Sequence, residues 1–229
     1  MRRSSVFVLF VSLFLTALPS FSQQDYITRY SAYAGFSYLS TPSLNLTQRG
    51  IDTDVGVNLR SWLTVGFDFS YNNGHSSLLP TYLNSATQAK LAPFLPLLPP
   101  GFVLAVPYDG SSYSYEAGPQ FNYRRLKKVT FFVRPALGAL HVDLTAKPTN
   151  PIAAQIVVGL LGPSLSKSDT VVFYGFGGGF TWEATHHVGI RVTADLVHYN
   201  MFSDLLNGGR NSVRVTVGTK FGFGKNILH

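Results

Sequence analysis

The sequence contains no cysteine among its 229 residues, which excludes a disulfide scaffold. Charged residues make up only 13% of the chain, and basic residues exceed acidic ones only mildly. No basic motif with interleaved aromatic residues accompanies that excess, so nucleic acid is not predicted as a partner. Beyond the N-terminal region there is no apolar run of about 18 residues, the signature of a membrane-spanning helix. A helical membrane protein is therefore excluded.

The N-terminal region has the pattern of a secretory signal peptide. Arg2 and Arg3 precede an apolar run at residues 6–18, and the small residues Ser20 and Ser22 suit a cleavage site. A membrane anchor is the less favoured alternative, because the run is shorter than the roughly 20 residues that a spanning helix needs. We predict a signal peptide at residues 1–22 and one domain at 23–229. Without Arg2 and Arg3, 16 basic residues face 11 acidic ones, a net charge of +5.

The clearest structural signal lies at residues 211–224. Side chains alternate between the two faces of a strand, and here one face is apolar while the other carries full charges. The apolar face consists of Val213, Val215, Val217, Thr219, Phe221 and Phe223. Arg214 and Lys220 lie on the other face. This alternation is typical of a strand with lipid outside and a wet interior inside, although a soluble sandwich strand can share it.

Seven earlier segments repeat this alternation, so eight strands are predicted. They are residues 26–39, 51–60, 63–72, 111–124, 129–144, 169–183, 188–199 and 211–224, with Tyr33 breaking the pattern in the first. Connections after the second, fourth and sixth strands are short turns. Longer loops follow the others, at about 40–50, 73–110 and 145–168 and before the last strand. Short turns on one side and long loops on the other are typical of transmembrane barrels.

These features predict an all-β fold, an eight-stranded antiparallel up-and-down transmembrane β-barrel. Closure satisfies every backbone hydrogen-bonding group inside the membrane, which an open sheet in lipid cannot do. Across residues 26–223 the sequence resembles the eight-stranded outer-membrane barrels of the OmpA and OmpX type. The resemblance rests on the strand pattern and on the closing strand.

The resemblance implies several properties that the pattern alone does not give. It implies a monomer in the outer membrane of a Gram-negative cell envelope, in contact with outer-membrane lipid and lipopolysaccharide. Val213, Val215, Val217, Phe221 and Phe223 would form the signal that the barrel-insertion machinery recognises. Members of this family often end on the last aromatic residue, whereas residues 224–229 follow it here.

The inner faces of the predicted strands carry a set of opposite charges. They are Arg29, Asp54, Arg60, Asp68, Glu116, Arg124, Arg134, Glu183, Arg191, Asp195, Arg214 and Lys220. Isolated charges in a narrow interior are costly, so a network of ion pairs and hydrogen bonds is expected. An ion pathway is the alternative. A plug of side chains is favoured, because eight strands leave an interior just wide enough for side chains to fill.

Signals for a metal site, a cofactor or catalysis are weak. Of six histidines only His186 and His187 adjoin, in a predicted turn, so neither a metal nor a cofactor is predicted. His75, His198, Ser76 and Ser203 are available for hydrolysis, but no His-x-Ser pattern with a matching carboxylate appears. We therefore predict no enzyme. A lipid A deacylase or acyltransferase of the same architecture is the alternative.

Two apolar blocks, residues 91–106 and 152–161, fall in the long loops. Exposed apolar loops of this size often mark an interaction surface. The preferred function is thus a structural or surface-interaction role through the external loops. A carrier of small hydrophobic compounds and a soluble lipocalin-like binder are further alternatives. The basic turn at 125–128 is read as a solvated turn, with contact to anionic headgroups or peptidoglycan as its alternative.

Overall fold

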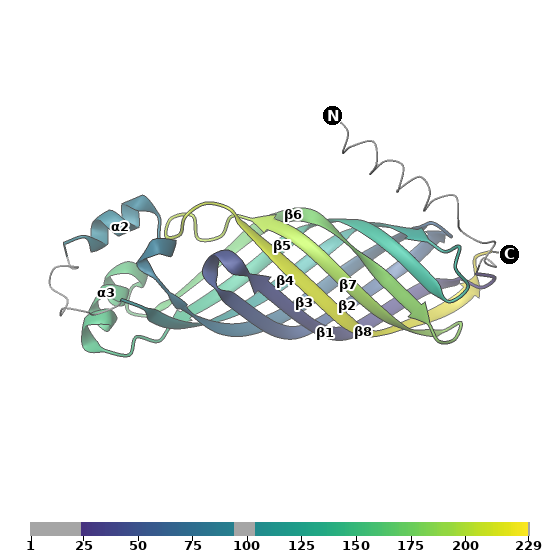
Figure 1. Ribbon diagram of the computed structural model, residues 1–229, viewed down its shortest axis with the longest axis horizontal. Helices are drawn as coiled ribbons and strands as arrows, with labels where there is room; N and C mark the ends of the chain where they lie inside the picture. Colours follow the sequence, from purple (N-terminus) through teal and green to yellow (C-terminus); the bar gives the residue numbers. More distant parts are fainter. Residues whose placement is uncertain (1–23, 94–103, 229) are drawn as a thin grey trace, which may run out of the picture.

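The computed structural model describes residues 24–93 and 104–228, and it contains one closed barrel (Figure 1). Each strand pairs antiparallel with its neighbours in the chain, and β1 pairs with β8 to close the barrel. The strands are β1 (Thr28–Thr41), β2 (Leu46–Arg60), β3 (Leu63–Leu78), β4 (Val106–Tyr123), β5 (Val129–Ala146), β6 (Ser166–Glu183), β7 (Val188–Tyr199) and β8 (Arg210–Asn226). The predicted eight-stranded up-and-down architecture is confirmed.

Alternation along each strand separates an apolar outside from a polar inside. On β8, Val213 and Val217 are exposed on the outer surface, whereas Arg214 and Thr216 between them are buried. On β6, Val172 keeps 69% of its surface exposed. The outside of the barrel is thus an apolar surface that a soluble protein would cover.

The strands are longer than the sequence pattern predicts. The loop predicted at 40–50 reduces to a single 3₁₀ turn, η1 (Pro42–Leu44), because β1 reaches Thr41 and β2 begins at Leu46. Inward residues continue the alternation here, with Leu44, Leu46 and Gln48 buried. The outward residues of this stretch are polar, whereas the outward residues of the other strands are apolar. The stretch therefore lacks the apolar–polar alternation that predicts a strand elsewhere, and its sequence resembles that of a loop.

Two longer connections contain helices. Between β3 and β4 lie η2 (Pro80–Tyr82) and α2 (Ser85–Leu91), and residues 94–103 of the predicted apolar block 91–106 fall outside the described residues. Between β5 and β6 the block at 152–161 forms α3 (Pro151–Leu161). Asn150 begins this helix, since its Oδ1 accepts a hydrogen bond from the Ala153 N–H at 2.8 Å. Within the described residues no helix is long and apolar enough to cross a membrane.

The two ends of the barrel differ. We call the end that carries α2, α3 and the β7–β8 connection (residues 200–209) the cap end; it lies on the left in Figure 1. The opposite end, with the turns after β2, β4 and β6, is the short-turn end, where β1 begins and β8 ends. The predicted signal peptide at residues 1–22 is outside the described residues.

A hydrophobic cluster joins the cap to the barrel. Met201, Phe202, Leu205 and Leu206 of the β7–β8 connection are buried. They belong to one cluster with Leu83 and Leu91 of the β3–β4 connection and with the inward residues Leu140, Phe173 and Val197 of the barrel. The cap therefore has a core of its own that continues into the barrel interior.

Residues 224–226, for which the sequence offered no role, extend the barrel at the short-turn end. β8 continues to Asn226, whose Oδ1 accepts a hydrogen bond from the Ile27 N–H at 2.9 Å. The Asn226 Nδ2 donates to the Asp25 carbonyl at 3.1 Å. Gln24 donates from Nε2 to the Thr130 hydroxyl at 3.0 Å. These bonds hold residues 24–28 at the mouth of the barrel.

One seam of the barrel is interrupted. Between β4 and β5, Glu116 pairs with Gly138 and Phe121 pairs with Val133, and no pairing is formed between these two points. The register places Pro119 directly opposite Pro135. Proline has no N–H, so each strand lacks a donor at the same level.

Candidate functional site

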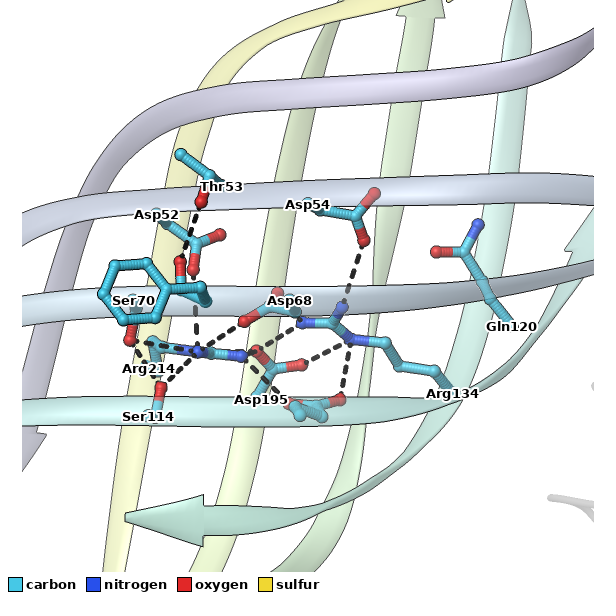
Figure 2. A network of polar contacts seen from close by, with 12 residues as sticks. Asp52, Thr53, Asp54, Asp68, Ser70, Ser114, Gln120, Arg134, Asp195 and Arg214 are labelled. Atoms are coloured by element: carbon cyan, nitrogen blue, oxygen red, sulfur yellow. Dashed lines mark hydrogen bonds and ion pairs between the residues drawn. The ribbon is translucent and has the colours of Figure 1, made fainter. Parts of the chain in front are cut away.

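Two arginines and five carboxylates meet in the middle of the barrel interior (Figure 2). Arg134 comes from β5 and Arg214 from β8. The carboxylates come from four other strands: Asp52 and Asp54 from β2, Asp68 from β3, Glu116 from β4 and Asp195 from β7. The network therefore ties together strands on all sides of the barrel.

Asp195 is the carboxylate that both arginines share. Its Oδ2 lies 2.8 Å from Arg214 Nη2 and 3.0 Å from Arg134 Nη2. Asp68 bridges the same pair, with one oxygen 3.0 Å from Arg214 Nη1 and the other 3.1 Å from Arg134 Nη2. Glu116 Oε2 lies 3.1 Å from Arg214 Nη2. Charge-assisted bonds of this length are the strong class of hydrogen bond.

Arg191 forms a second layer closer to the short-turn end. Its Nη1 donates to Asp54 Oδ1 at 3.3 Å, and its Nη2 donates to Gln120. The guanidinium also lies over the Phe132 ring, 4.3 Å from the centroid. In the same half of the barrel, Lys220 Nζ lies 2.6 Å from Glu183 Oε1.

The structure places ten of the twelve predicted residues in or near the interior. Asp54, Asp68, Glu116, Arg134, Arg191, Asp195 and Arg214 form the two layers just described, and Arg124, Glu183 and Lys220 lie at the short-turn end. Arg29 and Arg60 are exposed, contrary to the prediction. The pairing register shifts between Thr28 and Tyr30 and between Asn58 and Arg60. An irregularity of this kind adds a residue and turns the following side chain to the other face.

Sequence reasoning missed Asp52, Tyr33 and Phe132. Asp52 is 1% exposed and its Oδ1 lies 3.6 Å from Arg214 Nη1. Asp52 lies two residues before Asp54 on β2, so the alternation of the strand already places it on the inner face. Tyr33, which seemed to break the pattern of the first strand, points inward above Gly35, where a side chain would collide with its hydroxyl.

Three of the histidines and serines considered for metal binding or catalysis bond to groups outside that set. His198 Nδ1 is 2.8 Å from Asn211 Oδ1, and the Ser76 hydroxyl donates to the Asn45 carbonyl at 3.0 Å. His187 Nδ1 is 2.9 Å from the Gly222 carbonyl. Within residues 24–93 and 104–228 no three His, Cys, Asp or Glu side chains are grouped so as to hold a metal ion.

An apolar cavity of about 50 Å³ lies inside the cap end. Its lining includes Leu83, Leu91, Tyr108, Ile156 and Leu206, and Lys167 is the one charged residue among the described residues that line it. Lys167 forms an ion pair with Asp204 at 2.7 Å.

Comparison with known proteins identifies the fold and no closer relationship. No family model and no curated protein matches the sequence. The structure is similar to Neisserial surface protein A, with a TM-score of 0.52 and 10% identity over 85% of this chain and 96% of that chain. It also matches OprG of Pseudomonas aeruginosa, with a TM-score of 0.49 and 9% identity over 89% and 99% of the two chains.

A third match is Ail, the attachment invasion locus protein of Yersinia pestis, with a TM-score of 0.44 and 16% identity over 84% and 96% of the chains. At such low identity the likeness to Neisserial surface protein A shows the fold alone. The chain thus has the eight-stranded fold of outer-membrane barrels of the OmpA and OmpX type.

Proposed function

We propose that this protein is an integral barrel of a bacterial outer membrane, exported by its signal peptide, with a non-catalytic interaction role at its cap end. The observation that carries the proposal is the exposed apolar surface around a charged interior. Outward residues such as Phe36, Val172 and Phe176 are 50–69% exposed, while the interior charges Arg134, Asp195 and Arg214 are 8%, 1% and 4% exposed. An apolar outer surface around a charged interior is the arrangement expected of a barrel that is surrounded by lipid.

Aromatic residues at the short-turn end support the same proposal. Trp62, Tyr123, Trp182, Phe221 and Phe223 are each 39–53% exposed there. Aromatic side chains gather where a barrel crosses the interface between lipid and water. With short turns facing the periplasm, the cap end faces the outside of the cell.

Cell fractionation and labelling test the location and the orientation together. The chain has no cysteine, so Ser164→Cys in the cap and Lys127→Cys in the turn after β4 each supply a single thiol. We expect outer-membrane fractionation, slower gel migration after heating, and labelling of Ser164→Cys alone by an impermeant maleimide on intact cells. Recovery from the soluble periplasm, or labelling of Lys127→Cys alone, contradicts the proposal.

We further propose that the interior conducts no solute. Arg134 and Arg214 bridge carboxylates from opposite sides of the barrel, and their side chains are 8% and 5% exposed. Eight strands leave room only for the side chains themselves. In planar bilayers the purified protein should give no steady conductance; large, stable channels would overturn this part of the proposal.

The cap end is the proposed interaction surface. It is held by its own hydrophobic cluster, and α3 still presents Ile152 and Val158, 41% and 45% exposed, on its outer side. Such apolar positions on a fixed element suit docking to another protein or to lipopolysaccharide. The variant Ile152→Ser/Val158→Ser should lower binding of the detergent-solubilised protein to lipopolysaccharide-coated beads. The matched variant Ser164→Ala, elsewhere on the cap, should leave binding unchanged.

A carrier of small hydrophobic compounds is the second candidate, and the apolar cavity in the cap favours it. Its volume of about 50 Å³ is well below the ~300–1,000 Å³ of ordinary small-molecule sites, so it ranks second. A saturable fluorescence change with a naphthalene-type probe that Leu206→Trp abolishes would raise this candidate to first place.

An enzyme of the same architecture is the remaining alternative, and we propose against it. Catalysis by acyl transfer needs a nucleophile, a base and an orienting group within hydrogen-bond reach. His198 is bonded to Asn211 and Ser76 to the main chain. Lipid A profiles with and without expression should be identical. Loss or gain of an acyl chain that the variant His198→Ala abolishes would instead support the enzyme alternative.

A further inference from the structure

We propose that the short-turn end of the barrel binds a phosphate group in a basic cavity. The cavity has a volume of about 270 Å³ and lies at the barrel mouth, between residues 24–28, the turns after β4 and β6, and β8. Its cationic lining residues are Arg124, Lys127, Lys128 and Lys220, and its acidic ones are Asp25 and Glu183. These four cations and two acids give the lining an excess of two positive charges.

Only one of these cations is neutralised by an acid. Lys220 forms an ion pair with Glu183, and the two side chains are 12% and 14% exposed. Among the described residues, Arg124, Lys127 and Lys128 have no carboxylate within 4.0 Å. The lysines Lys147 and Lys167 at the cap end, in contrast, each pair with an aspartate.

Arg124 is the residue that turns this excess of charge into a site. Its Nε donates to the Ser61 carbonyl at 2.8 Å, and its Nη2 donates to Asn58 Oδ1 at 3.0 Å. Both acceptors are neutral, so they orient the guanidinium without compensating its charge. In the part of the chain that the structure describes, Nη1 has no acceptor.

The electrostatic cost at this position is reflected in the pKa of Arg124, which directly follows β4. The pKa of Arg124 is lowered to about 10, mainly by burial; the carboxylate of Glu183 opposes this shift, and the positive charge of Arg191 adds to it. A cation disfavoured by burial is stabilised when an anion joins it. The cavity thus offers an oriented guanidinium together with two lysines on the rim.

Phosphate is the anion that fits this set of groups. Arginine recognises the planar edge of an oxyanion with two donors, and lysine adds point charges around it. Two negative charges on a phosphate monoester match the excess of two positive charges. The source is either a soluble phosphate compound or a lipid headgroup, because the aromatic residues Trp62, Tyr123 and Trp182 place lipid beside the same rim.

The test uses residues 23–229 refolded in a non-ionic detergent, with inorganic phosphate as the probe. Amide NMR shifts of residues 24–28, 125–128 and 184–186 are followed at constant ionic strength. We expect saturable shifts confined to these residues. Arg124→Gln should weaken the apparent affinity about tenfold, the size expected for loss of a charge-assisted hydrogen bond. Lys147→Gln at the cap end should leave the affinity unchanged.

Two further measurements keep the outcome interpretable. Arg124→Lys retains the charge and should bind with intermediate affinity, and slower gel migration after heating establishes that each variant is folded. Shifts that grow linearly without saturation, or equal affinity in Arg124→Gln, overturn the proposal. In nanodiscs, suppression of phosphate binding by phosphatidylglycerol but not phosphatidylcholine identifies a lipid headgroup; no suppression identifies a soluble ligand. Because detergent is used, failure here leaves the proposed membrane location untouched.

Discussion

At the scale of single residues, the barrel interior depends on matched charges. Asp195 and Asp68 each bridge Arg134 and Arg214. A buried network of this kind is weak evidence for high stability, because desolvation offsets much of the attraction. Removing one member is a different matter, since it leaves its buried partners charged and only partly compensated.

The first prediction concerns Arg214, whose side chain is 5% exposed. Replacing it with Met leaves Asp195, Asp68 and Glu116 with Arg134 as their shared cation. We expect the free energy of unfolding in lipid vesicles to fall by about 3–5 kcal/mol, measured by guanidinium titration. Arg60→Met, at an exposed position, should change it by less than about 0.5 kcal/mol. Equal effects of the two substitutions would show that the interior pairs contribute no more than surface charge.

The second prediction concerns the glycines of β6. The inward glycines leave space for other side chains: a Cβ on Gly177 would overlap Asp195 Oδ1, and a Cβ on Gly179 would lie 3.0 Å from the Phe132 ring. Asp195 is pinned by two arginines and cannot move away freely. Gly177→Ala should therefore destabilise the barrel by about 1–3 kcal/mol in the same titration.

Gly159 provides the matched control for Gly177. A Cβ at Gly159 meets nothing within 4 Å, and the residue lies inside α3. Gly159→Ala should be neutral or stabilise the helix by up to about 1 kcal/mol. Loss of stability in both variants would mean that Gly177→Ala does not act by displacing the Asp195 carboxylate.

At the scale of elements, the ends of strands deviate most from a regular ladder. Shifts of register expose Arg29 and Arg60, and β8 passes its last aromatic residue to bind the N-terminal segment. The interrupted β4–β5 seam is the other departure. The β8 tail and the β4–β5 seam each lead to a prediction about local opening of the barrel.

The third prediction concerns Asn226, which accepts from the Ile27 N–H and donates to the Asp25 carbonyl. Asn226→Ala should free residues 24–28 while the barrel stays folded. We expect faster amide exchange at Ile27, by about tenfold for a loss near 1.4 kcal/mol. Lys225→Ala, at the exposed neighbouring position, should leave exchange unchanged; similar exchange in both variants would contradict the role given to the tail.

The fourth prediction concerns the prolines that face each other in the β4–β5 seam. Pro119→Val/Pro135→Val restores two donors, worth about 1 kcal/mol each, but frees the unfolded chain by about 0.4–1 kcal/mol per site. Global stability is therefore a poor readout. Amide exchange at residues 117–118 and 136–137 should slow, while exchange in the β2–β3 ladder stays the same. Unchanged exchange at the seam would mean that the prolines do not cause the interruption.

At the scale of the whole molecule, the proposed membrane location makes the outer face sensitive to charge by depth. Phe176 lies in the middle of β6, opposite Leu196 of β7, and is 67% exposed. The fifth prediction is that Phe176→Arg lowers the unfolding free energy in lipid vesicles by about 2–4 kcal/mol. Leu59→Arg, near the short-turn end, should cost only about 0–1 kcal/mol. Equal costs at the two depths would argue that this surface does not lie in a bilayer.

The sequence by itself determined the strand count, the antiparallel order and the side of each strand that is apolar. It did so because a period of two residues directly reports which face meets which solvent, as on β8, where valines alternate with Arg214 and Thr216. The same alternation places Asp52 and Tyr33 on the inner faces of their strands.

Only the tertiary structure decided which charges meet and where the strands end. Arg134 and Asp195 lie 61 positions apart in the chain and come together because closure brings β5 and β7 to one interior. The outward turn of Arg29 and Arg60 depends on register shifts that composition does not reveal. The cap likewise depends on tertiary contacts, because Met201 and Phe202 belong to one hydrophobic cluster with Leu83 and Leu91 of the β3–β4 connection. Contacts between distant segments follow from closure of the barrel, and a local sequence pattern does not predict them.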